Sequence, residues 1–286
     1  MLVEFVCPYC RSVLARIAWG YRCAGCGLSY REREGIHRFY DSRNASWQRV
    51  WDATRKHVRY HNEQYPPPIE IGWPYRSQNH TSLDGAHIDL RARAAMFNCA
   101  FETGAPSLWR SGSPVVVDVG SFAGWSSYLW ARHAHVVAID PWEWALSTID
   151  SSYRNGITKV VCDGERLPLA DCSVDVVFAA SAYHHMADKG AALAEWRRVL
   201  VPGGICVATG ESPMTPSYMA DHAQQDALKG ELPYDAEMMQ NAFVLSGFEI
   251  IKHRWVMYDP LMQYMTVEDL VVEKRADNGI IFGVKE

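Results

Sequence analysis

The chain has 286 residues, of which 48% are hydrophobic, and a net charge of -5 at neutral pH. This length allows one full domain with a sizeable core plus a small additional module. No apolar run approaches the ~20 residues that span a bilayer, which argues against a membrane protein. Because the N-terminus lacks a basic stretch followed by an apolar one, it does not resemble a secretory signal, and we expect a soluble, cytoplasmic protein.

The charge is distributed unevenly along the chain. Residues 1–60 contain 11 of the 28 lysines and arginines but 5 of the 33 acidic residues, so this segment carries +6 and the remainder -11. One interpretation is that the basic segment docks on the acidic remainder of the chain. The alternative is a basic patch for an anionic partner such as RNA.

Four cysteines punctuate the turn-rich residues 1–40. They form two C-x₂-C pairs separated by 12 residues, namely Cys7, Cys10, Cys23 and Cys26. Two such pairs can complete a tetrahedral four-sulfur site, as in zinc ribbons. Since four thiolates leave no open coordination position, we expect a structural Zn²⁺ in a ribbon module of residues 1–40. Two redox pairs or a disulfide framework are the alternatives.

Residues 41–112 are expected to form a helical, aromatic connector and a candidate lid. Three prolines at 66–68 interrupt any helix there, whereas residues 84–102 show a helical period between Asp84, a suitable N-cap, and Gly104. Aromatic and methionine side chains before and after the core could close over an apolar ligand, with ordinary packing as the alternative.

From residue 113 onward, apolar strand patterns alternate with helical ones. The predicted strands are residues 115–119, 136–139, 159–162, 174–179 and 205–209. The predicted helices between them are residues 125–132, 142–151 and 189–200, and a helix at 232–246 and strands at 248–257 and 279–285 follow. This alternation predicts an α/β domain over residues 113–286 with parallel βαβ units, and residues 212–233 as a lid insertion.

Acidic residues stand at the ends of three successive predicted strands. Asp118 precedes a turn in which Gly120 and Gly124 permit close backbone approach to a ligand. Asp140 ends the second strand, where a carboxylate can accept both hydroxyls of a ribose. Asp163 ends the third, where an acid can accept a hydrogen bond from an adenine amino group. Since ligands bind beyond the carboxyl ends of parallel strands, the three acids should surround one ligand.

Five segments between about residues 113 and 210 resemble, in order and spacing, the motifs of class I S-adenosylmethionine-dependent methyltransferases, of the type 11 kind. They are residues 118–124, Asp140, and residues 163–171, 175–185 and 195–204. The resemblance implies a Rossmann-like, seven-stranded, mostly parallel sheet with helices on both faces, and S-adenosyl-L-methionine as cofactor. It implies cofactor contacts by Asp118, Gly120, Ser121, Phe122, Gly124, Asp140, Pro141, Asp163, Gly164, Glu165 and Ser181.

Phe122 departs from the family pattern, which usually has a glycine at this position. Its side chain must therefore point away from the methionine part of the cofactor, or the loop must shift. A nicotinamide-dependent Rossmann enzyme is the alternative, but its G-x-G-x-x-G fingerprint is not matched by the G-x-x-x-G spacing of this loop.

Candidate catalytic groups follow the fourth and fifth predicted strands. His184 and His185 have the pKa range of a general base near neutral pH, and Glu211 is a second candidate. The alternatives are that the histidines only pack near the cofactor and that Glu211 is a surface or lid carboxylate.

Three functions remain open from the sequence. The first is methyl transfer to a small, apolar or aromatic molecule, which the acidic charge and the aromatic segments favour. The second is methylation of an RNA base, which the basic ribbon favours. The third is a cofactor-binding module without activity, which the three acids at the predicted strand ends argue against. The sequence assigns no oligomeric state and no membrane contact.

Overall fold

The computed structural model describes residues 3–43, 112–211, 236–256 and 278–285, together with short stretches between residues 45 and 109. Seven strands form the central sheet: β5 (Val115–Val119), β6 (His135–Ile139), β7 (Ile157–Val161), β8 (Val174–Ala180), β9 (Leu200–Glu211), β10 (Phe248–Val256) and β11 (Asn278–Lys285). The pairs β5–β6, β6–β7, β5–β8 and β8–β9 are parallel, whereas β11 lies antiparallel between β9 and β10. The predicted mostly parallel α/β sheet is therefore confirmed.

The first of the seven central strands, β5, lies in the middle of the central sheet. From β5 the chain proceeds outward through β6 to β7, and it then returns to β8 on the other side of β5. The carboxyl ends of β5 and β8 therefore mark the point at which the strand order reverses, where open α/β sheets bind ligands.

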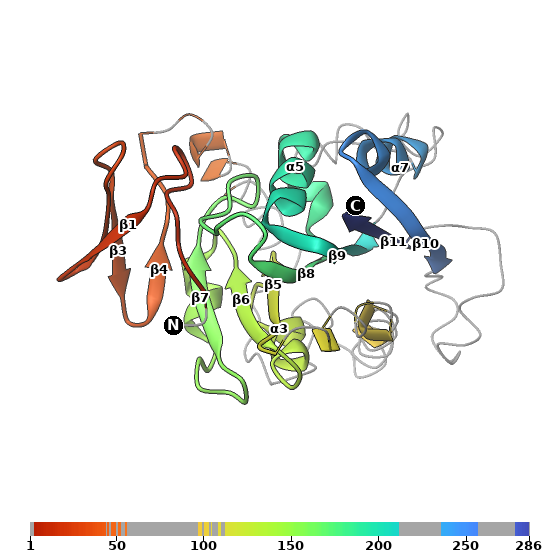
Figure 1. Cartoon of the computed structure of the whole chain (residues 1–286), viewed down its shortest axis with the longest axis horizontal. Coiled ribbons are helices and arrows are strands. Elements are labelled where there is room, and N and C mark those ends of the chain that lie inside the picture. Colours follow the sequence, from red (N-terminus) through yellow and green to blue (C-terminus); the bar gives the residue numbers. More distant parts are fainter. Residues whose placement is uncertain are drawn as a thin grey trace.

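The N-terminal segment extends the same sheet, which was not predicted. Its four strands are β1 (Leu14–Ile17), β2 (Gly20–Cys23), β3 (Ser29–Arg33) and β4 (Ile36–Arg38). Within the described residues the sheet thus has eleven strands rather than the expected seven, in the order β1-β2-β3-β4-β7-β6-β5-β8-β9-β11-β10 (Figure 1). The reason is that β4 pairs in parallel with β7, which would otherwise expose the unpaired backbone groups of an edge strand.

Helices cover both faces of the central sheet, as expected. Alternate residues of β5 point to opposite faces, so Val117 belongs to one apolar cluster and Val116 to the other. The first cluster includes side chains of α5 (Lys189–Val199) and α7 (Ala236–Leu245), and the second includes side chains of α3 (Trp125–Trp130) and α4 (Glu143–Ser147). In Figure 1, α5 and α7 lie on the opposite side of the central strands from α3. The five residues of β5 are all buried, as expected of a strand packed on both faces.

The N-terminal segment of residues 3–39, called the ribbon below, shares a hydrophobic core with the central sheet. Phe5, Tyr21 and Phe39 are at most 5% exposed and belong to the same cluster as Val117. The rings of Phe5 and Phe39 lie 4.7 Å apart between their centroids. These aromatic contacts add to the strand pairing in attaching the ribbon to the central sheet.

Several predictions fall largely or wholly outside the described residues. They include the lid at residues 212–233, most of the connector at 41–112, and most of the helix at 84–102, of which residues 97–98 and 100–102 are described and helical. Among the described residues, the helices are all too short or too polar to span a bilayer.

Candidate functional site

The three predicted acids lie at the same edge of the sheet. Asp118 is the fourth residue of β5, Asp140 directly follows β6, and Asp163 follows β7 by two residues. The register pairs Asp118 with Ala138 of β6, and Ile139 of β6 with Val160 of β7. Each acid is at most 7% exposed. The strand ends therefore place three buried carboxyl groups in a row, as the sequence predicted.

Backbone donors from two loops orient the carboxylate of Asp140. The backbone N–H of Phe122, in the loop after β5, donates to Oδ2 at 2.9 Å, and that of Trp142 donates to Oδ1 at 2.7 Å. Each oxygen keeps a second lone pair for a further donor. Asp140 is thus held in one orientation while retaining the capacity to accept two hydroxyl groups.

The turn after β5 requires its two glycines. Gly120 has φ +70° and Gly124 has φ +83°, in the left-handed region where side chains are strained. A Cβ on Gly120 would lie 2.5 Å from the Cβ of Ala182, and one on Gly124 would lie 2.9 Å from Ile149. The backbone N–H groups of Gly120 and Ser121 both donate to the Ile139 carbonyl, which ties the turn to β6.

Phe122 occupies this turn with φ +47°, although it is not a glycine. Its ring packs against Trp142 at 5.3 Å and Trp144 at 6.5 Å between centroids. Both tryptophans belong to the segment that follows Asp140, so the ring lies over the loop after β6. The structure thus shows that the ring packs against the start of α4, and its position relative to the methionine part of the cofactor stays a prediction.

The positive φ at position 122 strains any residue that has a side chain. Substitutions there can therefore separate the stabilising effect of ring packing from the destabilising effect of backbone strain. We expect Phe122→Ala to lower the free energy of unfolding by about 2 kcal/mol, since it removes ring packing but keeps the strain. We expect Phe122→Gly to be more stable than the alanine variant by about 1 kcal/mol, which reverses the usual order. Urea unfolding of both variants measures this difference, and a glycine variant that is less stable than the alanine variant would contradict the strain.

Asp118 contacts the beginning of α3. Its Oδ2 accepts hydrogen bonds from the hydroxyls of Ser126 at 2.7 Å and Ser127 at 2.5 Å. Within the described part of the chain, the other oxygen of Asp118 and the hydroxyl of Ser121 are buried without a hydrogen-bond partner. Buried polar atoms of this kind are uncommon and fit a site whose remaining partners belong to a bound ligand.

Burial changes the ionisation of these acids. Desolvation raises the pKa of Asp118 to about 7, against the opposing effect of the two serine hydroxyls. Desolvation also raises the pKa of Asp140 to about 6, although the two backbone donors favour its charged form. Burial likewise raises the pKa of Glu165. Perturbed acids gathered at one sheet edge are typical of a binding site.

Residues 163–169 follow β7 and are called the cofactor loop below, after the adenine contact that the sequence predicts for Asp163. Oδ1 of Asp163 accepts the backbone N–H of Glu165 at 2.9 Å, and the Gly164 carbonyl accepts the indole N–H of Trp196 in α5 at 3.0 Å. Glu165 in turn accepts the backbone N–H of Asp188, the N-cap of α5. The loop is thus attached to α5 on one side of the sheet.

The remaining predicted residues lie around the same edge. Ser181 directly follows β8 and has φ +51°, and Pro141 directly follows Asp140. His184 and His185 lie in η1 (Tyr183–His185), a single 3₁₀ turn after β8, are half-buried, and have ring centroids 3.9 Å apart. Glu211 is the last residue of β9. All five residues therefore lie at or just beyond the carboxyl ends of their strands.

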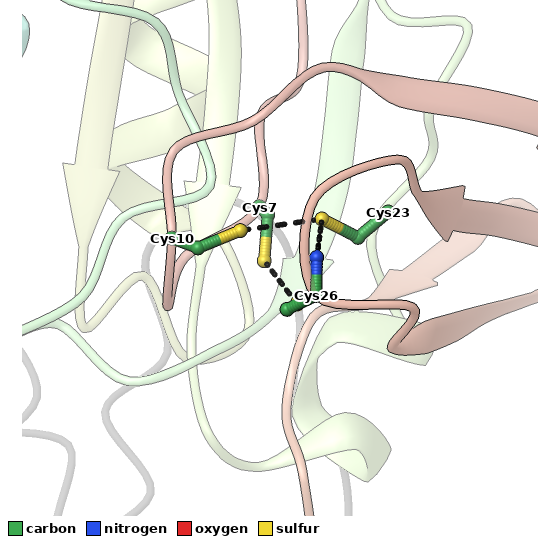
Figure 2. Close-up of side chains that lie close together, drawn as sticks. All are labelled: Cys7, Cys10, Cys23 and Cys26. Atoms are coloured by element: carbon green, nitrogen blue, oxygen red, sulfur yellow. Dashed lines mark hydrogen bonds between the residues drawn. The ribbon is translucent and has the colours of Figure 1, made fainter.

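The four cysteines of the ribbon form a compact cluster of sulfur atoms. All four Sγ atoms lie within 4.8 Å of one another, and the pairs Cys10–Cys23 and Cys7–Cys26 are separated by 3.3 and 3.6 Å (Figure 2). A tetrahedral ion with ~2.3 Å bonds to sulfur places its ligands ~3.8 Å apart. The donor set and spacing therefore fit a four-coordinate Zn²⁺. The four cysteines are not joined by disulfide bonds, which removes the disulfide alternative from this structure.

A tyrosine hydroxyl supports the cluster. The hydroxyl of Tyr30 lies 3.0 Å from Sγ of Cys7, and this tyrosine is 1% exposed. Groups that contact metal ligands in this way orient them for the metal.

The sequence did not identify several residues that complete the site. Ser126 and Ser127 bind Asp118, and Arg11 and Glu195 bind the cofactor loop. The serines carry a local signal, because they stand in the first turn of the helix that follows the glycine turn. The contact between Arg11 and Glu195 joins residues 184 positions apart and has no local signal.

Curated proteins with similar sequences are methyltransferases. The chain is 34% identical over 101 residues to a dimethylglycine N-methyltransferase of Parasynechococcus marenigrum (strain WH8102), covering 33% of this chain and 36% of that protein. It is 36% identical over 140 residues to a malonyl-[acyl-carrier protein] O-methyltransferase of Yersinia pestis, covering 43% and 51%. The chain thus matches only about a third to a half of the length of these relatives.

A solved structure of geranyl diphosphate methyltransferase in complex with GPP and sinefungin has a TM-score of 0.60 to this chain. The two are 13% identical, and the similarity covers 84% of this chain and all of the other, which shows a shared fold. Residues 117–208 match the family model described as a methyltransferase domain. This segment contains Asp118, Asp140 and Asp163, so the match coincides with the row of buried acids.

Proposed function

We propose that this chain is an S-adenosyl-L-methionine-dependent methyltransferase. The observation that carries the proposal is the row of three buried carboxyl groups at the ends of β5, β6 and β7, beside a glycine turn at the reversal of strand order. Two of these groups are arranged to accept hydrogen bonds from a ligand. Asp140 is oriented by two backbone N–H groups, and Asp118 has an oxygen without a partner in the described chain. The match of residues 117–208 to a methyltransferase domain supports the same function.

Different residues of the site are assigned to different parts of the cofactor. Asp140 accepts the ribose hydroxyls, and Asp163 accepts the adenine amino group. The turn from Asp118 to Gly124, with Ser121 and the backbone of Phe122, holds the methionine part. Further contacts come from Pro141, Gly164, Glu165 and Ser181. When bound, S-adenosyl-L-methionine supplies an electrophilic methyl group, so positioning of the acceptor provides much of the catalysis.

The ionisation of the acids predicts how cofactor binding depends on pH. An ionised carboxylate accepts hydroxyl donors more strongly than a protonated one. Since burial raises the pKa of Asp140 to about 6, the free protein has to release a proton from this group on binding at lower pH. We expect the affinity for S-adenosylhomocysteine to be constant above pH 8 and to fall by up to about tenfold per unit below pH 6. Calorimetry from pH 5 to pH 9 measures this, and an affinity that rises as the pH falls would contradict the assignment.

We propose a small, apolar or aromatic molecule as the methyl acceptor. A dimethylglycine N-methyltransferase among the relatives is named for a small substrate. Two basic side chains of the ribbon are engaged within the chain, because Arg11 contacts Glu195 and Arg38 contacts Glu143. This reduces the basic surface available for the alternative acceptor, RNA, although Arg22 and Arg31 remain exposed.

His184 and His185 are proposed as the groups that accept a proton when the acceptor atom carries one, and Glu211 as the second candidate. The histidines lie just beyond β8, the strand that pairs with β5 and its buried Asp118. An acceptor that has no proton to lose requires no base, and the histidines would then only line the site.

Transfer of a radioactive methyl group tests the function and the acceptor class together. The protein is incubated with labelled S-adenosyl-L-methionine and a cell extract, and label is measured separately in RNA and in the organic phase. We expect label in the organic phase that is absent with Asp140→Asn. Label in RNA would indicate methylation of an RNA base, and label in neither fraction would indicate a binding module without activity.

We further propose that Cys7, Cys10, Cys23 and Cys26 hold a structural Zn²⁺. The support is the four-sulfur cluster itself and the hydroxyl of Tyr30 beside Cys7. Since four thiolates fill a tetrahedral ion, the metal stabilises the ribbon and does not bind substrate.

A further inference from the structure

The segment between the first two cysteines lies against the cofactor loop. Residues 7–11, called the knuckle here, include Cys7, Cys10 and Arg11. Just before the knuckle, the backbone N–H of Val6 donates to the Pro168 carbonyl at 3.0 Å, and Phe5 forms an antiparallel bridge with Leu169. The ribbon therefore supplies a short piece of strand to a loop that has little regular structure of its own.

Arg11 connects the knuckle to Leu167, directly at its carbonyl and through Glu195 at its N–H. Its Nη1 donates to the Leu167 carbonyl at 3.0 Å, and its Nη2 donates to Oε1 of Glu195 at 2.6 Å. The other oxygen of Glu195 accepts the backbone N–H of Leu167 at 3.0 Å. Arg11 is itself fixed in the knuckle, because its backbone N–H donates to the Cys7 carbonyl at 2.9 Å. A planar guanidinium suits such a two-pronged contact better than an ammonium does.

Tyr9 provides a second contact between the knuckle and the loop. The guanidinium of Arg166 lies 5.6 Å from the centre of the Tyr9 ring. The tyrosine hydroxyl accepts the backbone N–H of Asp41 at 2.9 Å, which fixes the ring. Cation–π contacts of this geometry are weak at an exposed site and add to the effect of Arg11.

The same loop begins at the acid assigned to adenine. The backbone N–H of Arg166 donates to the Asp163 carbonyl at 3.0 Å, and that of Glu165 donates to its Oδ1. The knuckle thus contacts Arg166 and Leu167, and residues 5–6 just before it contact Pro168 and Leu169. These residues of the loop follow Asp163 closely in the chain.

We infer that the knuckle positions the cofactor loop through Arg11, which shares the Leu167 carbonyl with Arg198 of α5. Resting on the proposed cofactor function, this means that the four-cysteine site influences cofactor affinity through the position of the loop. Arg11 acts through the backbone of Leu167 and Tyr9 through the side chain of Arg166, and neither takes part in methyl transfer.

The test compares Arg11→Ala with Arg16→Ala in the whole 286-residue chain. Arg16 is a matched control, because it forms an ion pair with Glu32 inside the ribbon, at 2.5 Å. Amide hydrogen exchange is followed by mass spectrometry in peptides covering residues 163–171, and S-adenosylhomocysteine binding is measured by calorimetry. Zinc content and thermal unfolding show whether each variant keeps the ribbon. Arg11→Lys retains the charge without the two-pronged contact, and serves if the alanine variant fails to fold.

We expect Arg11→Ala to bind S-adenosylhomocysteine about five- to tenfold more weakly and to exchange residues 163–171 about tenfold faster, with Arg16→Ala unchanged in both. The lysine variant should fall between wild type and alanine. Unchanged exchange in Arg11→Ala with intact zinc content would overturn the inference. If the wild-type protein does not bind S-adenosylhomocysteine, the proposed function fails, and the exchange measurement still decides whether the knuckle holds the loop.

Discussion

Asp140→Asn should weaken S-adenosylhomocysteine binding by at least about a hundredfold while leaving the free protein at least as stable as wild type at pH 8. The loss of binding follows because the amide presents one acceptor where the carboxylate presents two. The amide nitrogen would also face the backbone N–H of either Phe122 or Trp142, both of which now donate to the carboxylate.

The stability of this variant follows from the sign of the pKa shift. Burial raises the pKa of Asp140 from 3.8 to about 6, so this group favours the folded state only when it is protonated. Its contribution is complete below the unfolded pKa and is lost as the pH rises through 6. At pH 8 the ionised group costs about 3 kcal/mol, which the asparagine removes, against about 1 kcal/mol for one lost hydrogen bond.

Urea unfolding at pH 8 and calorimetry measure the two effects separately. Asp150→Asn is the matched control, because Asp150 is exposed and lies in the same connection between β6 and β7. The control should bind S-adenosylhomocysteine like the wild-type protein. Wild-type affinity in Asp140→Asn would remove Asp140 from the site.

Cys23→Ser should release the metal and lower the free energy of unfolding by at least about 3 kcal/mol. The effect is expected to extend beyond the ribbon, because Cys23 is 2% exposed and belongs to the apolar cluster that contains Val117 of β5. Loss of the ribbon would also deprive β7 of its partner β4 and the cofactor loop of Arg11. We therefore expect S-adenosylhomocysteine affinity to fall as well, by about tenfold or more.

The control for this change is Cys172→Ser, since Cys172 is exposed and lies outside the sulfur cluster. Zinc content is measured by mass spectrometry of the metal, and stability by urea unfolding. A wild-type protein that contains no metal when purified without chelator would contradict the zinc assignment. So would a Cys23→Ser variant as stable as Cys172→Ser.

The central sheet and its row of acids were predictable from local patterns. The apolar run Val115–Val119 is buried on both faces and forms β5 with those bounds, and Asp140 and Asp163 follow the next two strands as expected. The periodicity of an apolar segment and the position of a polar residue at its end are both local properties of the chain. The spacing of the four cysteines was also sufficient to predict a compact four-sulfur cluster.

The attachment of the ribbon could not be predicted in this way. β4 has three residues, and its pairing with β7 joins Ile36 to Lys159, far apart in the sequence. Such pairing depends on which edge of the sheet is free, and this is a property of the assembled fold. The contact of Arg11 with Glu195 has the same character, and only the excess of basic residues in the N-terminal segment hinted at it.

The position of Phe122 was only partly predictable from the sequence. The sequence showed that a bulky residue occupies a position that the related family usually gives to glycine. The structure shows where its ring goes, because Trp142 and Trp144 provide the packing surface. Trp142 precedes α4 and Trp144 lies in its first turn, so their role depends on two connections meeting at one sheet edge.

Calorimetric titration of the purified protein with S-adenosylhomocysteine, and separately with NADH, tests the central claim most directly. The row of Asp118, Asp140 and Asp163 beside the glycine turn predicts binding of S-adenosylhomocysteine at one site per chain and none of NADH. Binding of NADH with none of S-adenosylhomocysteine would contradict the account and favour a nicotinamide-dependent enzyme.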